Sequence, residues 1–208
     1  MNTTSGSKPG GRGVFKYELL LLLTSIIWGA AFVAQQIGME RGLGPMTFNG
    51  LRFALGCLSL VPVLMWRRRG RDAASRPAKL PIAGSALAGL FLFAAASLQQ
   101  IGLQYTSSAN AGFIVGFYIL FVPVLGLLFG HRAKVSLWVG IAVSLVGLYL
   151  LSVTGDFVVS KGDVLVLIGA VLWACQILAI DRVASGGDPI VISLLQFGHM
   201  GIFISQSV

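Results

Sequence analysis

Apolar runs of about 20 residues recur along the whole chain, and they constrain its fold more than any other feature. At 1.5 Å per residue, a helix of that length crosses the roughly 30 Å hydrocarbon core of a bilayer. Backbone groups in lipid must be satisfied within the protein, and the sequence has no alternating pattern of barrel strands. We therefore expect an all-α, polytopic transmembrane helix bundle. Its seven spans are predicted at roughly Leu19–Gly38, Pro45–Trp66, Pro81–Leu103, Ser107–Phe129, Ser136–Val153, Gly162–Val183 and Pro189–Val208.

The composition excludes several classes of function. A chain that is 56% hydrophobic and 11% charged, with a mean hydropathy of +0.86, is not a soluble globular domain. The formal net charge is +8, but Lys and Arg lie between the apolar runs rather than along one face, so no nucleic-acid partner is expected. Cys57 and Cys175 fall inside apolar runs and predict neither a disulfide nor a metal site. Paired carboxylates and an activated nucleophile are also missing, so we predict no enzyme and no cofactor.

Basic residues concentrate in alternate loops. They precede the first span and follow the second and fourth: Lys8, Arg12, Lys16; Arg67, Arg68, Arg69, Arg71, Arg76, Lys79; Arg132, Lys134. Because Lys and Arg in short loops stay in the cytoplasm, the amino terminus is predicted inside the plasma (inner) membrane, and seven crossings put the carboxyl terminus outside. Residues 1–18 are predicted to form a flexible cytoplasmic tail, since their first part is rich in Gly, Ser and Thr.

An internal repeat relates the beginning of the chain to its end. Lys16–Gln35 aligns with Lys161–Ile180, and Gly44–Phe53 aligns with Asp188–Phe197. This alignment matches Trp28 with Trp173, Pro45 with Pro189, and Phe53 with Phe197. The repeat unit contains five spans, and an odd number inverts the second copy in the membrane. We expect a first five-helix unit at 19–153 and an incomplete second unit of two helices at 162–208; the alternative is chance similarity between apolar segments.

The sequence also resembles a known family. Gly102–Arg132, Gly140–Ser152, the Leu51–Phe53 triplet and Trp28 resemble the first unit of the EamA family in the drug/metabolite transporter superfamily. The resemblance implies ten helices in two inverted five-helix units, both termini in the cytoplasm, and movement of small metabolites across the inner membrane. This chain departs from the family in having Gly130-His131 where Gly-Glu is usual, and in having seven spans rather than ten.

Polar side chains inside the spans are the candidate substrate-binding residues, because such groups are expensive in hydrocarbon and often functional. Arg52 lies about seven residues into the second span, where an uncompensated arginine costs on the order of 3 kcal/mol. It suits a carboxylate or phosphate in a central cavity; snorkelling to the interface is the alternative. The neutral candidates, for each of which interhelical hydrogen bonding is the alternative, are Gln35, Gln36, Asn49, Gln99, Gln100, Asn110, Tyr118, Gln176, Gln196 and His199.

The expected function is that of an inner-membrane permease or exporter of small metabolites, either amino acids or drug-like solutes. Its partners are the lipid bilayer, a small-molecule substrate, and a second copy or a complementary subunit. One alternative is an inactive or partner-dependent truncated transporter fragment, because three helices of a complete second unit are missing. Another is a seven-helix receptor, which requires an outside amino terminus and so disagrees with the loop charges.

Overall fold

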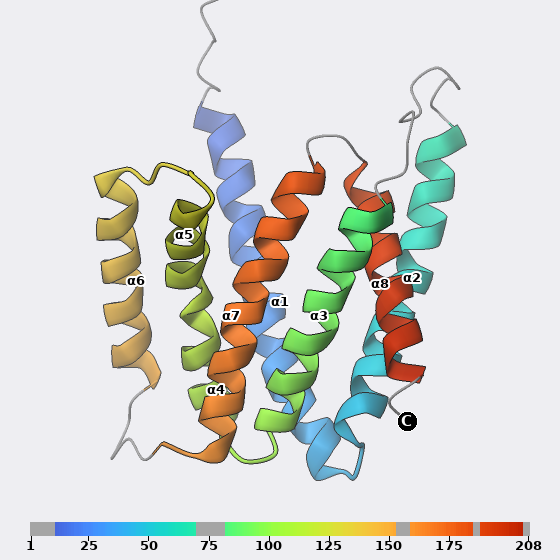
Figure 1. The fold of residues 1–208 in the computed structure, drawn as a ribbon, viewed down its shortest axis with the longest axis horizontal. Coiled ribbons are helices and arrows are strands. Elements are labelled where there is room, and N and C mark those ends of the chain that lie inside the picture. The colour runs from blue at the N-terminus through green and yellow to red at the C-terminus, as the bar shows by residue number, and fades with distance from the viewer. Residues whose placement is uncertain (1–10, 70–81, 153–158, 185–187, 206–208) are drawn as a thin grey trace, which may run out of the picture.

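The computed structural model describes residues 11–69, 82–152, 159–184 and 188–205, and this part of the chain is helical without strands (Figure 1). The predicted all-α fold is therefore confirmed. The helices are α1 (Gly11–Glu40), α2 (Pro45–Arg69), α3 (Ile82–Gly102), α4 (Ser108–Gly116), α5 (Tyr118–Leu128), α6 (Val135–Ser152), α7 (Lys161–Ala184) and α8 (Pro189–Ser205).

The helices match the predicted spans, with α4 and α5 sharing the fourth. Five spans are long and apolar enough to cross a membrane, and α6 and α8 are shorter apolar helices. α1 begins at Gly11, eight residues before the predicted start at Leu19, because a helix already nucleated by an apolar run extends at little cost. The remainder of the predicted tail, residues 1–10, and the basic residues Arg71, Arg76 and Lys79 lie outside the described residues.

The fourth span is interrupted at Phe117, between α4 and α5. Ser107 caps α4 by accepting a hydrogen bond from the backbone N–H of Asn110 at 3.1 Å. At the break, the N–H of Phe117 donates to Ile114 at 3.1 Å and the N–H of Leu120 donates to Phe117 at 2.9 Å, which is 3₁₀-type bonding. Phe117 itself keeps right-handed helical dihedral angles, so α4 and α5 together still form one candidate span, Ser108–Leu128.

The two ends of the repeat run in opposite directions. In Figure 1, α1 and α7 are antiparallel, and so are α2 and α8. Residues that the repeat alignment matches also contact each other: Trp28 meets Trp173 with ring centroids 6.0 Å apart, and Phe53 meets Phe197 at 5.4 Å, both edge to face. Mutual contact of matched residues is expected near a twofold axis in the membrane plane. The opposite directions and the two contacts are what an inverted repeat predicts; the repeat and its unit boundaries stay a prediction.

Small residues allow α3 and α7 to approach closely at the centre of the bundle. A Cβ atom added to Gly162 would overlap the carbonyl oxygen of Gly102 and lie 2.9 Å from the backbone of Tyr105. One added to Gly169 would lie 3.2 Å from the carbonyl oxygen of Ala95. Helices in lipid associate mainly through such close packing, since there is little hydrophobic driving force between them. The α3–α7 contact is therefore the main packing interface of the described bundle.

Substituting Gly162→Ala tests this interface. The added methyl group meets backbone rather than a flexible side chain, so we expect a loss of about 1–3 kcal/mol, as for overpacked cores. Gly147→Ala in α6 is the matched control, because its Cβ would have no neighbour within 4 Å. Thermal unfolding in detergent should show a lower midpoint for Gly162→Ala alone. Equal midpoints for the two variants would contradict the packing assigned to α3 and α7.

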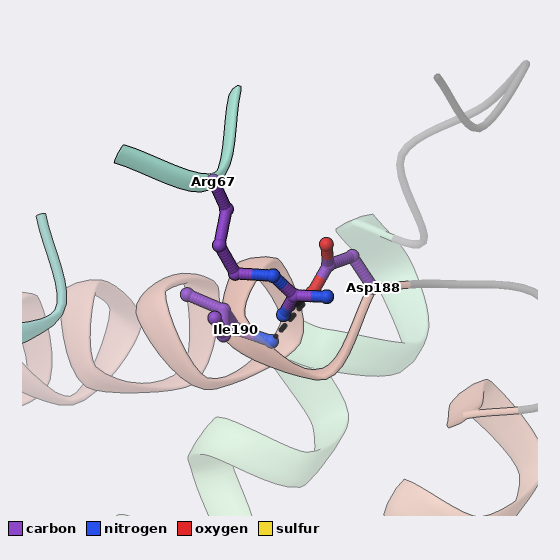
Figure 2. A network of polar contacts seen from close by, with 3 residues as sticks. All are labelled: Arg67, Asp188 and Ile190. Atoms are coloured by element: carbon purple, nitrogen blue, oxygen red, sulfur yellow. Dashed lines mark hydrogen bonds and ion pairs between the residues drawn. The ribbon is translucent and has the colours of Figure 1, made fainter. Parts of the chain in front are cut away.

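Polar contacts tie helices together at both ends of the bundle. At one end, the Arg67 guanidinium lies 3.5 Å from the Asp188 carboxylate, which also accepts a hydrogen bond at 3.0 Å from the N–H of Ile190 (Figure 2). At the other end, Thr106 donates to Asp163 at 2.6 Å, and Asp163 also accepts from the N–H of Ser160 at 2.7 Å. Each carboxylate thus accepts a hydrogen bond from a backbone N–H at the start of its own helix. Each also contacts another part of the chain, Arg67 of α2 or Thr106 of the α3–α4 connection.

Two substitutions separate the roles of Asp188. Asp188→Asn keeps an N-cap oxygen for Ile190 but removes the charge, whereas Asp188→Ala removes both. We expect Ala to cost about 1 kcal/mol more than Asn, which is the usual value of a cap. The ion pair itself should contribute less than about 1 kcal/mol, because Arg67 is 37% exposed. Unfolding midpoints measured in the same detergent check the order; identical losses for Asn and Ala would rule out the cap.

Candidate functional site

A cavity of about 540 Å³ lies between helices from both ends of the repeat. Ligand pockets commonly measure 300–1,000 Å³, so a small organic molecule fits. Every described helix except α6 contributes to the wall, which is mainly apolar and aromatic. The lining residues are Ile27, Trp28, Ala31, Phe32, Gln35, Arg52, Phe53, Gly56, Leu92, Gln99, Val115, Tyr118, Trp173, Gln176, Ile177, Ile180, Ser193, Gln196 and Phe197.

Side-chain amides form two separate hydrogen-bonded groups in the cavity wall. Gln99 of α3 is at the centre of the first: its Nε2 donates to Oε1 of Gln35 at 3.4 Å, and its Oε1 accepts from the Trp173 indole at 3.0 Å. Gln176 donates to Gln196 at 2.9 Å, joining α7 to α8. Gln35, Gln99 and Gln196 are each at most 3% exposed. These bonds hold polar groups at fixed positions around an otherwise apolar space.

Arg52 brings the charge to this site. It is half-buried on α2, with its Cζ 4.6 Å from the centre of the Phe53 ring, a cation–π arrangement. No carboxylate is among the described residues that line the cavity. Tyr118, next to the interruption of the fourth span, adds a half-buried phenol to the same wall.

The structure places six of the eleven candidate residues in the cavity wall: Gln35, Arg52, Gln99, Tyr118, Gln176 and Gln196. The other five lie elsewhere. Asn49 donates to the carbonyl of Ala96 at 3.1 Å and joins α2 to α3. Gln36 binds Glu40 and the N–H of Ser108, and His199 lies 2.6 Å from the carbonyl of Leu195 in its own helix.

Gln100 and Asn110 complete this group. Gln100 is fully buried on α3, and neither amide atom has a hydrogen-bond partner. Asn110 is partly exposed in the first turn of α4, where its backbone binds the Ser107 cap. Both residues lie outside the cavity wall, so neither is among the side chains that the structure brings together there.

The aromatic part of the wall is absent from the candidates chosen by polarity. Trp28, Trp173 and Phe197 all line the cavity, and Trp173 also donates to Gln99. The repeat alignment is the signal that could have identified them. Aromatic residues that it matches are expected to meet near the twofold axis that relates the two copies. No group of His, Cys, Asp and Glu suited to a metal ion occurs among the described residues.

Comparison with known proteins finds similarity to membrane transporters along most of the chain. Residues 15–153 match the EamA-like transporter family. The chain is 30% identical over 94% of its length to an uncharacterized transporter of Archaeoglobus fulgidus, covering 58% of that protein. It is 33% identical over 72% of its length to the uncharacterized inner membrane transporter YedA of Escherichia coli, covering 48% of it.

More limited similarity extends to a protein whose name states its cargo. The S-adenosylmethionine/S-adenosylhomocysteine transporter of Chlamydia trachomatis is 34% identical over 47% of the chain, which covers 29% of that transporter. The chain thus spans about half to three-fifths of the length of the relatives that it matches over most of its own length. No solved structure matches it significantly. The apolar helices and the family match together show a multi-pass membrane protein, and the chain belongs to the EamA-like transporter family.

Proposed function

We propose that this protein is an inner-membrane permease or exporter of small metabolites, amino acids or drug-like solutes, and that the cavity is its substrate site. The observation that carries the proposal is that α1 and α2 and their repeat counterparts α7 and α8 all contribute residues to the cavity wall. Transporters built from inverted repeats bind substrate at such an interface, near the middle of the membrane. All eleven residues named from the sequence remain candidates, with the six in the cavity wall favoured.

The chemistry of the wall supports a small organic solute. Fixed amides and one arginine are expensive in a membrane, and they are retained where a polar substrate or water is handled. Aromatic rings around them provide contact area for an apolar substrate group. A receptor or enzyme role has no comparable support, because the family relationship is to transporters.

Binding to the cavity can be followed with its own tryptophans. The chain has four Trp residues, and the Trp66→Phe/Trp138→Phe variant retains only the two in the cavity wall. We expect saturable changes in its emission with at least one class of amino acid, aromatic carboxylate or nucleoside-type solute such as S-adenosylmethionine. The control Trp28→Phe/Trp173→Phe should not respond. A solute that binds is then tested for uptake into proteoliposomes.

The binding and uptake results distinguish a permease from a partner-dependent fragment. Uptake of a bound solute supports a permease. Saturable binding without uptake favours the partner-dependent fragment. If no solute changes the emission of the cavity tryptophans, the cavity is not the substrate site.

We also propose that the amino terminus is cytoplasmic. α2 and α5 end at the same side of the bundle where α1 begins (Figure 1). The basic residues Arg67–Arg69 end α2, and Arg132 and Lys134 lie in the connection from α5 to α6. With Cys57 and Cys175 replaced by Ala, a membrane-impermeant maleimide applied to intact cells should label Arg41→Cys but not Lys134→Cys. Both should be labelled after permeabilisation. The reverse pattern would place the amino terminus outside.

A further inference from the structure

The charge around the cavity is unbalanced. Arg52 is the only charged residue among the described residues of its wall. Within the described part of the chain its guanidinium contacts the Phe53 ring but makes no hydrogen bond or ion pair. A cation in this position is stabilised by water or by a ligand of opposite charge. We propose that the cavity selects organic anions: Arg52 binds a carboxylate or similar anionic group, and the aromatic wall binds an apolar body. This inference rests on the proposed function of the cavity.

The position of Arg52 makes it available to a ligand. Arg52 is the eighth residue of α2 and lies about two turns inside the span, away from the polar groups at the helix end. The Phe53 ring occupies one face of the guanidinium, and stacking leaves the N–H groups at its edge for a carboxylate. Two parallel hydrogen bonds from one guanidinium to a carboxylate are charge-assisted, so they are stronger than hydrogen bonds between neutral groups.

The rest of the wall requires that the anion be organic. Trp28, Trp173 and Phe197 surround the space with rings, and Ile177 and Ile180 add aliphatic surface. A bare inorganic ion would leave this surface in contact with water. A phenyl or alkyl group covers it, which is favourable in proportion to the apolar area removed from water.

Cationic groups meet no anionic acceptor in the same space, although the amide oxygen of Gln176 and the aromatic faces are open to them. Oε1 of Gln99 already accepts from Trp173, Oε1 of Gln196 accepts from Gln176, and Oε1 of Gln35 accepts from Gln99. No carboxylate among the described lining residues is available to pair with an ammonium or sulfonium group. Arg52 repels such a group. The expected order of affinity is therefore anion, then neutral molecule, then cation, with a zwitterion below the anion.

Four ligands of nearly the same shape test this order: 3-phenylpropionate, 3-phenylpropanol, L-phenylalanine and 2-phenylethylamine. Each is titrated into the full chain carrying Trp66→Phe/Trp138→Phe, in detergent, with emission of the cavity tryptophans as the readout. A hydrogen-bonded charge pair should make 3-phenylpropionate bind about ten- to a hundredfold more tightly than the alcohol. The amine should bind most weakly, and inorganic phosphate should not compete.

Variants then assign the preference to Arg52. Arg52→Gln should make the acid and the alcohol bind equally, and Arg52→Lys should keep a smaller preference for the acid. Arg132→Gln, which removes the same charge from an exposed residue between α5 and α6, should leave the preference unchanged. A retained preference in Arg52→Gln would overturn the assignment.

The series in the protein with Arg52 intact decides the question even if a variant does not fold. Equal binding of acid and alcohol would overturn anion selection while leaving the cavity as a solute site. Competition by inorganic phosphate at the same potency as 3-phenylpropionate would overturn the apolar half of the inference. Failure of every solute to bind, in this series and in the wider set above, would remove the proposed function itself.

Discussion

A polar group inside a bilayer is costly to leave without a hydrogen-bond partner, and most of the buried side-chain amides in the described helices have one. The indole N–H of Trp173 donates to the amide of Gln99, which donates to the amide of Gln35, so these hydrogen bonds join three helices. This arrangement is geometrically possible because glycines bring α3 and α7 close enough together. Close packing of α3 against α7 and the hydrogen bonds of the cavity wall therefore depend on each other.

Most of the fold could be predicted from the sequence because its determinants are local. The length of an apolar run decides whether a helix can cross lipid, and all seven predicted runs coincide with helices. The repeat alignment also matches Trp28 with Trp173 and Phe53 with Phe197, and the residues of each pair are in contact in the structure. The sequence marks the fourth span for a kink at Pro123, which lies inside α5, whereas the one-residue break at Phe117 has no marker of its own.

The site was less predictable, because a polar residue in a span reveals its cost but not its partner. Asn49 and Gln99 look alike in sequence, yet Asn49 binds a backbone carbonyl between α2 and α3 while Gln99 lines the cavity. The difference depends on which face of each helix meets a neighbour, and long-range packing sets that. Arg52 is marked as a candidate by its charge alone, whereas Trp173 is not marked by polarity, because its indole is largely apolar and has a single N–H.

The paired aromatic residues have a consequence for motion. A contact between residues related by a twofold axis is carried onto itself when the two related halves exchange conformations. The edge-to-face contact of Trp28 with Trp173 would keep the same two residues in such an exchange but interchange the ring that presents its edge and the ring that presents its face. A contact away from the axis, such as Arg67 with Asp188, has no symmetric counterpart and so biases the equilibrium towards the state in which it forms.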